Sequence, residues 1–259
     1  MKLLNLATLV VPLALFSVCA VTPRVALAEG SPTSHARTCM QTSNIKLTKD
    51  GEGFEDPDQV IRLLSDCLSG WPDAPTKFRA MSLQMRAAAH AQKKDYTRAI
   101  ADREESMRLM PSRTGWDIIS LASDYREDGQ PERAVELLRT MLQNNMGLRG
   151  KGTTPGMPSY YHLGRSLIAL QHWSSAAEAL SEGMRYQPDY VWAYAYRGLA
   201  YDRMKQTEMA RADVDKVRSL IRESKPDARE RDQKVFQEPP FTELSTKYPE
   251  ASPSQVKQD

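Results

Sequence analysis

Hydrophobic positions along the chain recur with the spacing of amphipathic helices, and the same spacing returns one helix pair later. The stretch 160–188 aligns with the stretch 194–222. Matching residues, each pair 34 positions apart, are Tyr160 and Tyr194, Gly164 and Gly198, and Ala176 and Ala210. A fixed period of this length indicates a stacked array, because one helix pair cannot bury its apolar face alone. The pattern therefore predicts an all-α solenoid.

Two weaker copies of the same pattern precede this pair. The four predicted repeats cover about 80–113, 115–148, 157–190 and 191–224. A small residue in each first helix, and an alanine in each second helix, would let the two helices of a repeat pack closely. The first-helix residues are Ala87, Ala122, Gly164 and Gly198, and the second-helix residues are Ala99, Ala134, Ala176 and Ala210.

These residues resemble the tetratricopeptide repeat (TPR) pattern, in which a first helix reads W-x2-L-G-x2-Y and a second carries Ala, an aromatic residue and Pro. The fourth repeat supplies Tyr194, Gly198, Tyr201 and Ala210 at the matching places. Arg103 departs from the pattern, because it stands where an aromatic residue is usual. The resemblance implies a right-handed superhelix of about four helix-turn-helix repeats within a repeat domain over 57–224.

Segments on either side of the repeats depart from the pattern. Residues 57–70 resemble another second helix and are predicted to form a half-repeat that caps the stack, after an irregular segment over 29–56. Residues 147–156 form an insertion that could loosen the stack or make a surface loop. Residues 225–259 are predicted to contain a polar capping helix and, from Glu238, a mostly disordered tail.

Residues 1–28 have the features of an export signal. A short positive start precedes the uncharged, mostly apolar stretch 3–21, and Ala26 and Ala28 provide a small-x-small cleavage site. We therefore expect an exported protein, located in the periplasm of a Gram-negative bacterium, with no membrane insertion after the signal is cleaved. The alternative is an anchor formed by the uncleaved segment. A lipid anchor at Cys19 is disfavoured because a branched residue precedes it.

Charge and cysteine content change once this leader is removed. The chain has 35 Lys and Arg against 33 Asp and Glu, and the leader holds two of the basic residues, so 33 of each would remain. A neutral chain gives no support for nucleic acid or an acidic membrane surface as a partner. Cys39 and Cys67 would remain as a pair, and export predicts a disulfide between them, worth roughly 3–4 kcal/mol. Two buried or free thiols are the alternative.

Signatures of catalysis are missing from the sequence. The four histidines have no metal-binding spacing, there is no G-x-S-x-G motif, and the glycines of 147–156 do not fit a phosphate-binding loop. We therefore expect no enzyme activity, no cofactor and no metal, because function must be argued from a site. An enzyme with an unrecognised active site is the alternative from another class.

The family resemblance implies a binding groove, because first helices line the concave face of TPR arrays. Carrying the groove positions onto this chain gives Gln84, Trp116, Ile119, Arg126, Tyr161, Arg165, Trp192, Leu199, Asp202 and Arg203. Aromatic residues beside arginines are typical of interface hot spots, although each side chain could instead pack on its neighbouring helix.

The sequence thus predicts a non-catalytic protein–protein interaction module or scaffold, with a peptide or a partner helix bound in the groove. The alternative is a structural or assembly subunit of a cell-envelope complex. The two differ in a measurable way, since the first would be a soluble protein that binds peptides and the second would be unstable alone. No oligomeric state follows from the pattern.

Overall fold

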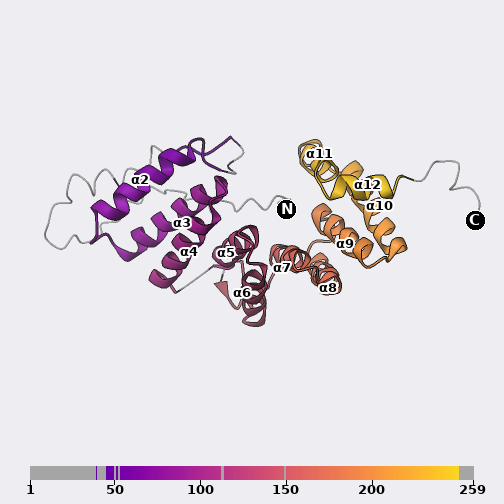
Figure 1. Cartoon of the computed structure of the whole chain (residues 1–259), viewed down its shortest axis with the longest axis horizontal. Helices are drawn as coiled ribbons and strands as arrows, with labels where there is room; N and C mark the ends of the chain where they lie inside the picture. The colour runs from indigo at the N-terminus through magenta and orange to yellow at the C-terminus, as the bar shows by residue number, and fades with distance from the viewer. Residues whose placement is uncertain are drawn as a thin grey trace, which may run out of the picture. The chain divides into compact units, whose positions relative to one another are not determined.

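The chain folds into helical hairpins that form two compact units, which meet in the sequence between Gln130 and Pro131 (Figure 1). The computed structural model describes Cys39 and the ranges 45–49, 51, 53–111, 114–148 and 150–250. The predicted leader over 1–28 and the last residues of the predicted tail lie outside these ranges. Apart from one short hairpin, every element described is a helix, so the all-α prediction is confirmed.

The N-terminal unit is a row of helices in which each packs on the next. They are α2 (Pro57–Gly70), α3 (Thr76–Gln92), α4 (Tyr96–Leu109) and α5 (Gly115–Glu127). Local sequence explains where two of them begin. Asp56 accepts a hydrogen bond from the backbone N–H of Gln59 ahead of α2, and Thr114 and Asp117 form a reciprocal capping box at the start of α5.

The segment before α2 folds back on itself and is held against the end of α3. Leu47 and Phe54 form an antiparallel bridge, and Phe54 is buried with Val60 and Leu64 of α2. The side-chain amide of Gln92 accepts a hydrogen bond from Phe54 N and donates one to Phe54 O, both at 2.9 Å. Part of the irregular segment expected over 29–56 is therefore ordered by contact with the repeats.

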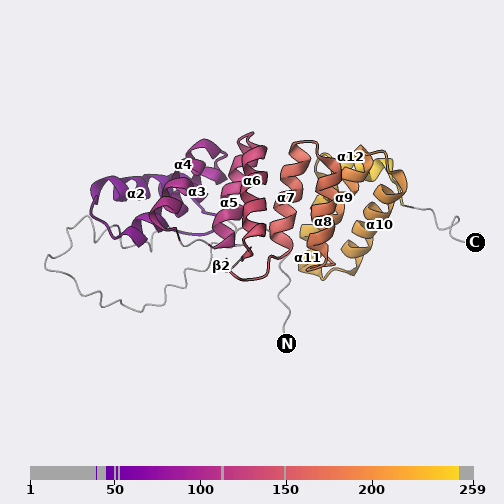
Figure 2. The ribbon, with the colours of Figure 1, turned by 90° about the horizontal axis from the view of Figure 1, so that it is seen from below.

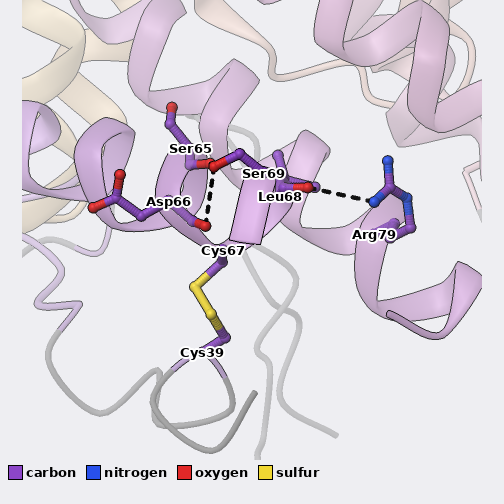
Figure 3. Close-up of a disulfide and its surroundings, with 7 residues drawn as sticks. All are labelled: Cys39, Ser65, Asp66, Cys67, Leu68, Ser69 and Arg79. Carbon is purple, nitrogen blue, oxygen red and sulfur yellow. Dashed lines mark hydrogen bonds between the residues drawn. A yellow bond between two sulfur atoms is a disulfide. The ribbon is translucent and has the colours of Figure 1, made fainter. Parts of the chain in front are cut away.

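Cys67 lies on the buried face of α2 and faces Cys39 (Figure 3). Their Cα atoms are 5.5 Å apart, a separation that a disulfide spans, and Figure 3 shows the bond between the two sulfur atoms. A disulfide here would tie Cys39, 28 residues upstream, to the first helix of the unit.

The C-terminal unit contains the remaining hairpins. They are α6 (Pro131–Gln143), α7 (Met157–Ala169), α8 (Trp173–Met184), α9 (Val191–Arg203) and α10 (Thr207–Glu223), each packed on its neighbour in the sequence (Figure 2). The second predicted repeat is thus divided, because α5 belongs to one unit and α6 to the other. The insertion over 147–156 forms an antiparallel hairpin of β1 (Met146–Gly147) and β2 (Gly150–Lys151).

Small residues set the close approach of the helices, as the sequence predicts. Six alanines at the packing positions of the repeats are completely buried, namely Ala87, Ala99, Ala122, Ala134, Ala176 and Ala210. A Cβ atom on Gly164 would lie 2.7 Å from Leu180 Cγ, and one on Gly198 would lie 3.2 Å from Asp213 Cβ. The prediction that these positions require small side chains is confirmed.

The end of the chain differs from its prediction. After α11 (Pro226–Gln233) and the short 3-10 helix η2 (Lys234–Gln237), a further helix α12 (Phe241–Lys247) stands where a disordered tail was expected from Glu238. Phe241, Leu244 and Tyr248 are buried in the core of the C-terminal unit. Phe241 and Leu244 lie on one face of α12 and Tyr248 directly follows the helix, so apolar burial orders a segment whose proline and charge content suggested disorder. Within the described ranges, no helix is both long enough and apolar enough to cross a bilayer.

Candidate functional site

The first helices of the last two repeats bring aromatic rings and an arginine together. Tyr161 and Arg165 are one turn apart on α7, and Trp192 and Tyr196 are one turn apart on α9, so each pair shares a side of its helix. The Arg165 guanidinium carbon lies 5.6 Å from the centre of the Tyr161 ring and 5.4 Å from that of Tyr196. These are cation–π distances. We call these four residues the aromatic face.

Side chains within the aromatic face differ in exposure. Tyr161 is buried, because the rings of Tyr190 and Tyr196 meet it edge-on at 5.2 and 5.6 Å. Arg165, Trp192 and Tyr196 are only half-buried. The structure therefore brings together three residues predicted for the groove, Tyr161, Arg165 and Trp192, and adds Tyr196.

Helix α12 packs on the α9 part of this face. The Phe241 ring meets Tyr196 edge-on at 4.8 Å and Trp192 at 6.0 Å. Leu199 of α9 is buried in the same cluster as Leu244 of α12. Leu199 is therefore a packing residue in this structure, which corrects its assignment to an open groove.

Asp202 holds the other end of α12. Its Oδ1 atom accepts hydrogen bonds from Lys247 Nζ at 2.6 Å and from Tyr248 Oη at 2.7 Å. Burial alone would raise the pKa of Asp202, but the hydrogen bonds from Lys247 and Tyr248 outweigh it and hold that pKa below its ordinary value. Arg203, the next predicted groove residue, is exposed.

A buried charge network uses Gln84, the predicted groove residue of the first repeat. Gln84 Oε1 accepts a hydrogen bond from Arg103 Nη1 at 2.9 Å, and Arg103 Nε donates to Asp124 Oδ2 at 2.6 Å. The side chains of Arg103 and Asp124 are both under 10 % exposed. Burial raises the pKa of Asp124, and the neighbouring Arg103 opposes that rise. Arg103 departs from the repeat pattern because it links α4 to α5 through this pair.

Predicted groove residues on α5 are mostly turned inward. Ile119 is completely buried, and Arg126 is buried with hydrogen bonds to Ser123 Oγ and to Glu127. The structure corrects the assignment of these two residues to an accessible groove, because their side chains are buried within the row of helices. Trp116 is half-buried.

Two matching arginine–aspartate pairs were not predicted. Arg86 donates two hydrogen bonds to Asp102, at 2.7 and 2.6 Å, and a third to Ser65 Oγ of the preceding helix. The same arrangement returns in the other unit, where Arg197 bonds Asp213 twice and Ser181 Oγ once; we call each set a triad. The hydrogen bonds that Arg86 donates to Asp102 raise the pKa of Arg86.

A sequence signal for these triads does exist. In both repeats the arginine directly precedes the small packing residue of the first helix, and the aspartate follows the arginine 16 positions later. Because each triad joins three successive helices, it fixes how one hairpin stacks on the next.

Another surface feature is a shallow polar pocket of about 400 Å³ between α8 and the end of α9. Glu178, Glu182, Arg185 and Tyr201 line it, and Arg185 already pairs with Glu182 at 3.1 Å. No predicted groove residue lies in it. Over the same described ranges, no three His, Cys, Asp or Glu side chains gather as a metal ion would require.

Comparison with known proteins identifies the fold. No family model matches the sequence, and no curated protein matches it. The structure matches residues 41 to the end of MamA from Desulfovibrio magneticus RS-1 with a TM-score of 0.56 and 17% identity, over 66% of this chain and 88% of that one. It also matches TPR-like repeats described as those of a kinesin light chain from Podosopora anserina, with a TM-score of 0.53 and 19% identity, over 63% and 86%. The chain therefore has the TPR fold that its sequence predicts.

Proposed function

We propose that this protein is a non-catalytic protein–protein interaction module or scaffold that binds a peptide or a partner helix on the first helices of its repeats. The observation that carries the proposal is the aromatic face, where Arg165 lies against two tyrosine rings that contact each other, beside a half-buried tryptophan. Tryptophan, tyrosine and arginine are the residues most enriched at interface hot spots.

Titratable groups in the structure also favour binding over catalysis. The buried carboxylates Asp124 and Asp213 each face an arginine that donates hydrogen bonds to them. Ion pairs of this kind perturb pKa values for structural reasons. In the polar pocket beside α8, Glu182 and Arg185 likewise pair with each other at the surface.

The proposal places the protein outside the cytoplasm, in the periplasm of a Gram-negative bacterium. Its support is the leader-like sequence over 1–28 and the approach of Cys39 to Cys67, because disulfides persist in oxidising compartments. The test is the mass of the protein recovered from a periplasmic fraction. A chain that begins after Ala28 and whose two cysteines resist alkylation would agree, whereas recovery from the cytoplasm with both cysteines alkylated would refute this part.

The binding proposal is tested by site-specific photo-crosslinking in the native host. A photoreactive residue at Ala169, exposed one turn after Arg165 on α7, should give a discrete adduct with one partner protein, whereas one at Met209, which is 47% exposed on α10, should not. The variant Arg165→Ala should lose capture of that partner. Arg185→Ala is the matched control, because Arg185 is an exposed arginine on the polar pocket. Equal adducts from both positions would refute the proposal.

A further inference from the structure

Helix α12 already occupies part of the surface proposed for binding. Phe241 contacts Trp192 and Tyr196, and Asp202 accepts hydrogen bonds from the far end of the same helix. Trp192, Leu199 and Asp202, all predicted from the sequence to face a partner, are thus contacted by the chain itself. The structure therefore contains an example of what this surface binds.

The chemistry of α12 defines the kind of ligand. Phe241 and Leu244 are buried on one face of the helix. Tyr248, four residues after Leu244 and directly after the helix, is also buried. Thr242 and Glu243, on the other side, are exposed. A short amphipathic helix in a groove is a common mode of peptide recognition, and its anchors are spaced in this way.

Polar contacts also select the orientation of the helix. Lys247 and Tyr248 meet Asp202 on α9, while the guanidinium of Arg218 on α10 donates to the backbone oxygens of Ser245 and Tyr248. Ser245 is in the last turn of α12 and Tyr248 caps it, and carbonyl groups at this end of a helix lack partners within the helix. A cation at the end of the helix and an acid beside it therefore fix its direction.

Two properties of α12 limit its stability on its own. It has only seven residues, and helices of this length are not stable in water without packing. The side chain of Lys247 is 59% exposed, so its ion pair with Asp202 is open to water and competing ions. Its fold therefore depends on docking, and docking rests on three apolar anchors.

We infer that the α9 surface formed by Trp192, Tyr196, Leu199 and Asp202 binds a short amphipathic helix of a partner protein, and that α12 occupies this site until the partner displaces it. The partner helix carries an aromatic residue, a leucine and a tyrosine at positions i, i+3 and i+7, with a lysine directly before the tyrosine. This inference rests on the proposed function and names the class of its ligand.

The test measures competition at this surface in the full-length chain. The probe is a fluorescein-labelled peptide with the sequence of residues 240–249, and its binding is followed by fluorescence anisotropy. The double variant Phe241→Ala/Leu244→Ala, which removes two anchors of α12, should bind the peptide at least tenfold more tightly than the wild type, because the internal competitor is weakened. Equal affinity for both chains would overturn the inference.

The matched control alters the exposed side of the same helix. Glu243→Ala should bind the peptide as weakly as the wild type, because it leaves all three anchors in place. Adding Asp202→Asn to the double variant Phe241→Ala/Leu244→Ala should reduce its affinity for the peptide several-fold. A tighter complex with the control, or no effect of Asp202→Asn, would contradict the proposed site.

A second variant guards against loss of fold. Lys247→Glu places a negative charge opposite Asp202 and keeps the apolar anchors, so it should also raise peptide binding several-fold. The amides of α9 and α10 must keep their wild-type protection from hydrogen exchange in Lys247→Glu and in Phe241→Ala/Leu244→Ala. Exposure of α9 and α10 amides would mean that α12 is a permanent part of the core, and it would overturn the inference.

These outcomes separate the inference from the proposed function. If the peptide displaces α12 but a probe at position 169 gives no partner adduct, the exchange stands and the proposed function fails. If the wild type and the double variant Phe241→Ala/Leu244→Ala capture the partner equally, the proposed function stands and the role of α12 as competitor fails.

Discussion

The triad around Arg197 gives a prediction whose size can be worked from the structure. Replacing Asp213 by Ala removes both acceptors of the guanidinium, which then keeps only the bond to Ser181. Breaking a fully buried ion pair costs about 3–5 kcal/mol. Asp213 is 6% exposed, but Arg197 is 20% exposed and can recover some hydration. We therefore expect the free energy of unfolding of the C-terminal unit to fall by about 2–4 kcal/mol.

The assay must report on one unit at a time, because a chain with two units does not have to unfold in a single transition. Urea-dependent hydrogen exchange of peptides from α9 and α10 provides that resolution. The matched control is Asp102→Ala, which breaks the equivalent triad and should lower protection in α3 and α4 while leaving α9 unchanged.

A double-mutant cycle with Arg197→Ala tests the cause. The double variant should be more stable than the sum of the single effects implies, because removing both partners leaves neither charge buried alone. A loss below about 0.5 kcal/mol for Asp213→Ala, or strictly additive effects, would refute the reasoning that the triad holds the stack together.

Three further predictions follow from the packing and the charges. Hydrogen bonds lower the pKa of Asp202, so docking of α12 should be complete above the ordinary aspartate range near pH 4. Docking should weaken as the pH falls through the lowered pKa. Trp192 fluorescence should show this transition, and Asp202→Asn should abolish it. Reduction of the Cys39–Cys67 bond should lower the unfolding free energy of the N-terminal unit by roughly 3–4 kcal/mol, measured by urea titration with and without reductant; a Cys-to-Ser pair insensitive to reductant is the control. Gly164→Ala should lower the free energy of unfolding by about 1–3 kcal/mol, since the new methyl group would lie 2.7 Å from a leucine atom of α8. An unchanged midpoint of thermal unfolding would contradict this prediction.

The sequence predicted the helical hairpins well because their packing depends on residue size at fixed intervals. Gly164 against Leu180 is such a case, since only a small residue allows that contact. The sequence also placed Tyr161, Arg165 and Trp192 on one surface, because the repeat period sets which first-helix residues face the same way.

Contacts between distant segments were harder to predict. Phe241 and Tyr248 carry a helical apolar pattern, but prolines and polar residues around them suggested disorder. The triads require three helices in register, so the sequence led to no prediction for Arg86 and Arg197. The division of the second repeat between α5 and α6 has no local signal, because it depends on which neighbour each helix packs against.

The contact between Gln92 and Phe54 has a consequence for aggregation. In the Leu47–Phe54 bridge, the backbone bonds run from Thr48 to Gly53 and from Glu55 to Lys46, so the N–H and C=O of Phe54 point away from the hairpin. An open strand edge of this kind can recruit a strand from another molecule. Gln92 satisfies both groups with one amide, as the next strand of a sheet would. A single side chain from a helix thus blocks β-strand addition at the point where the hairpin would otherwise accept it.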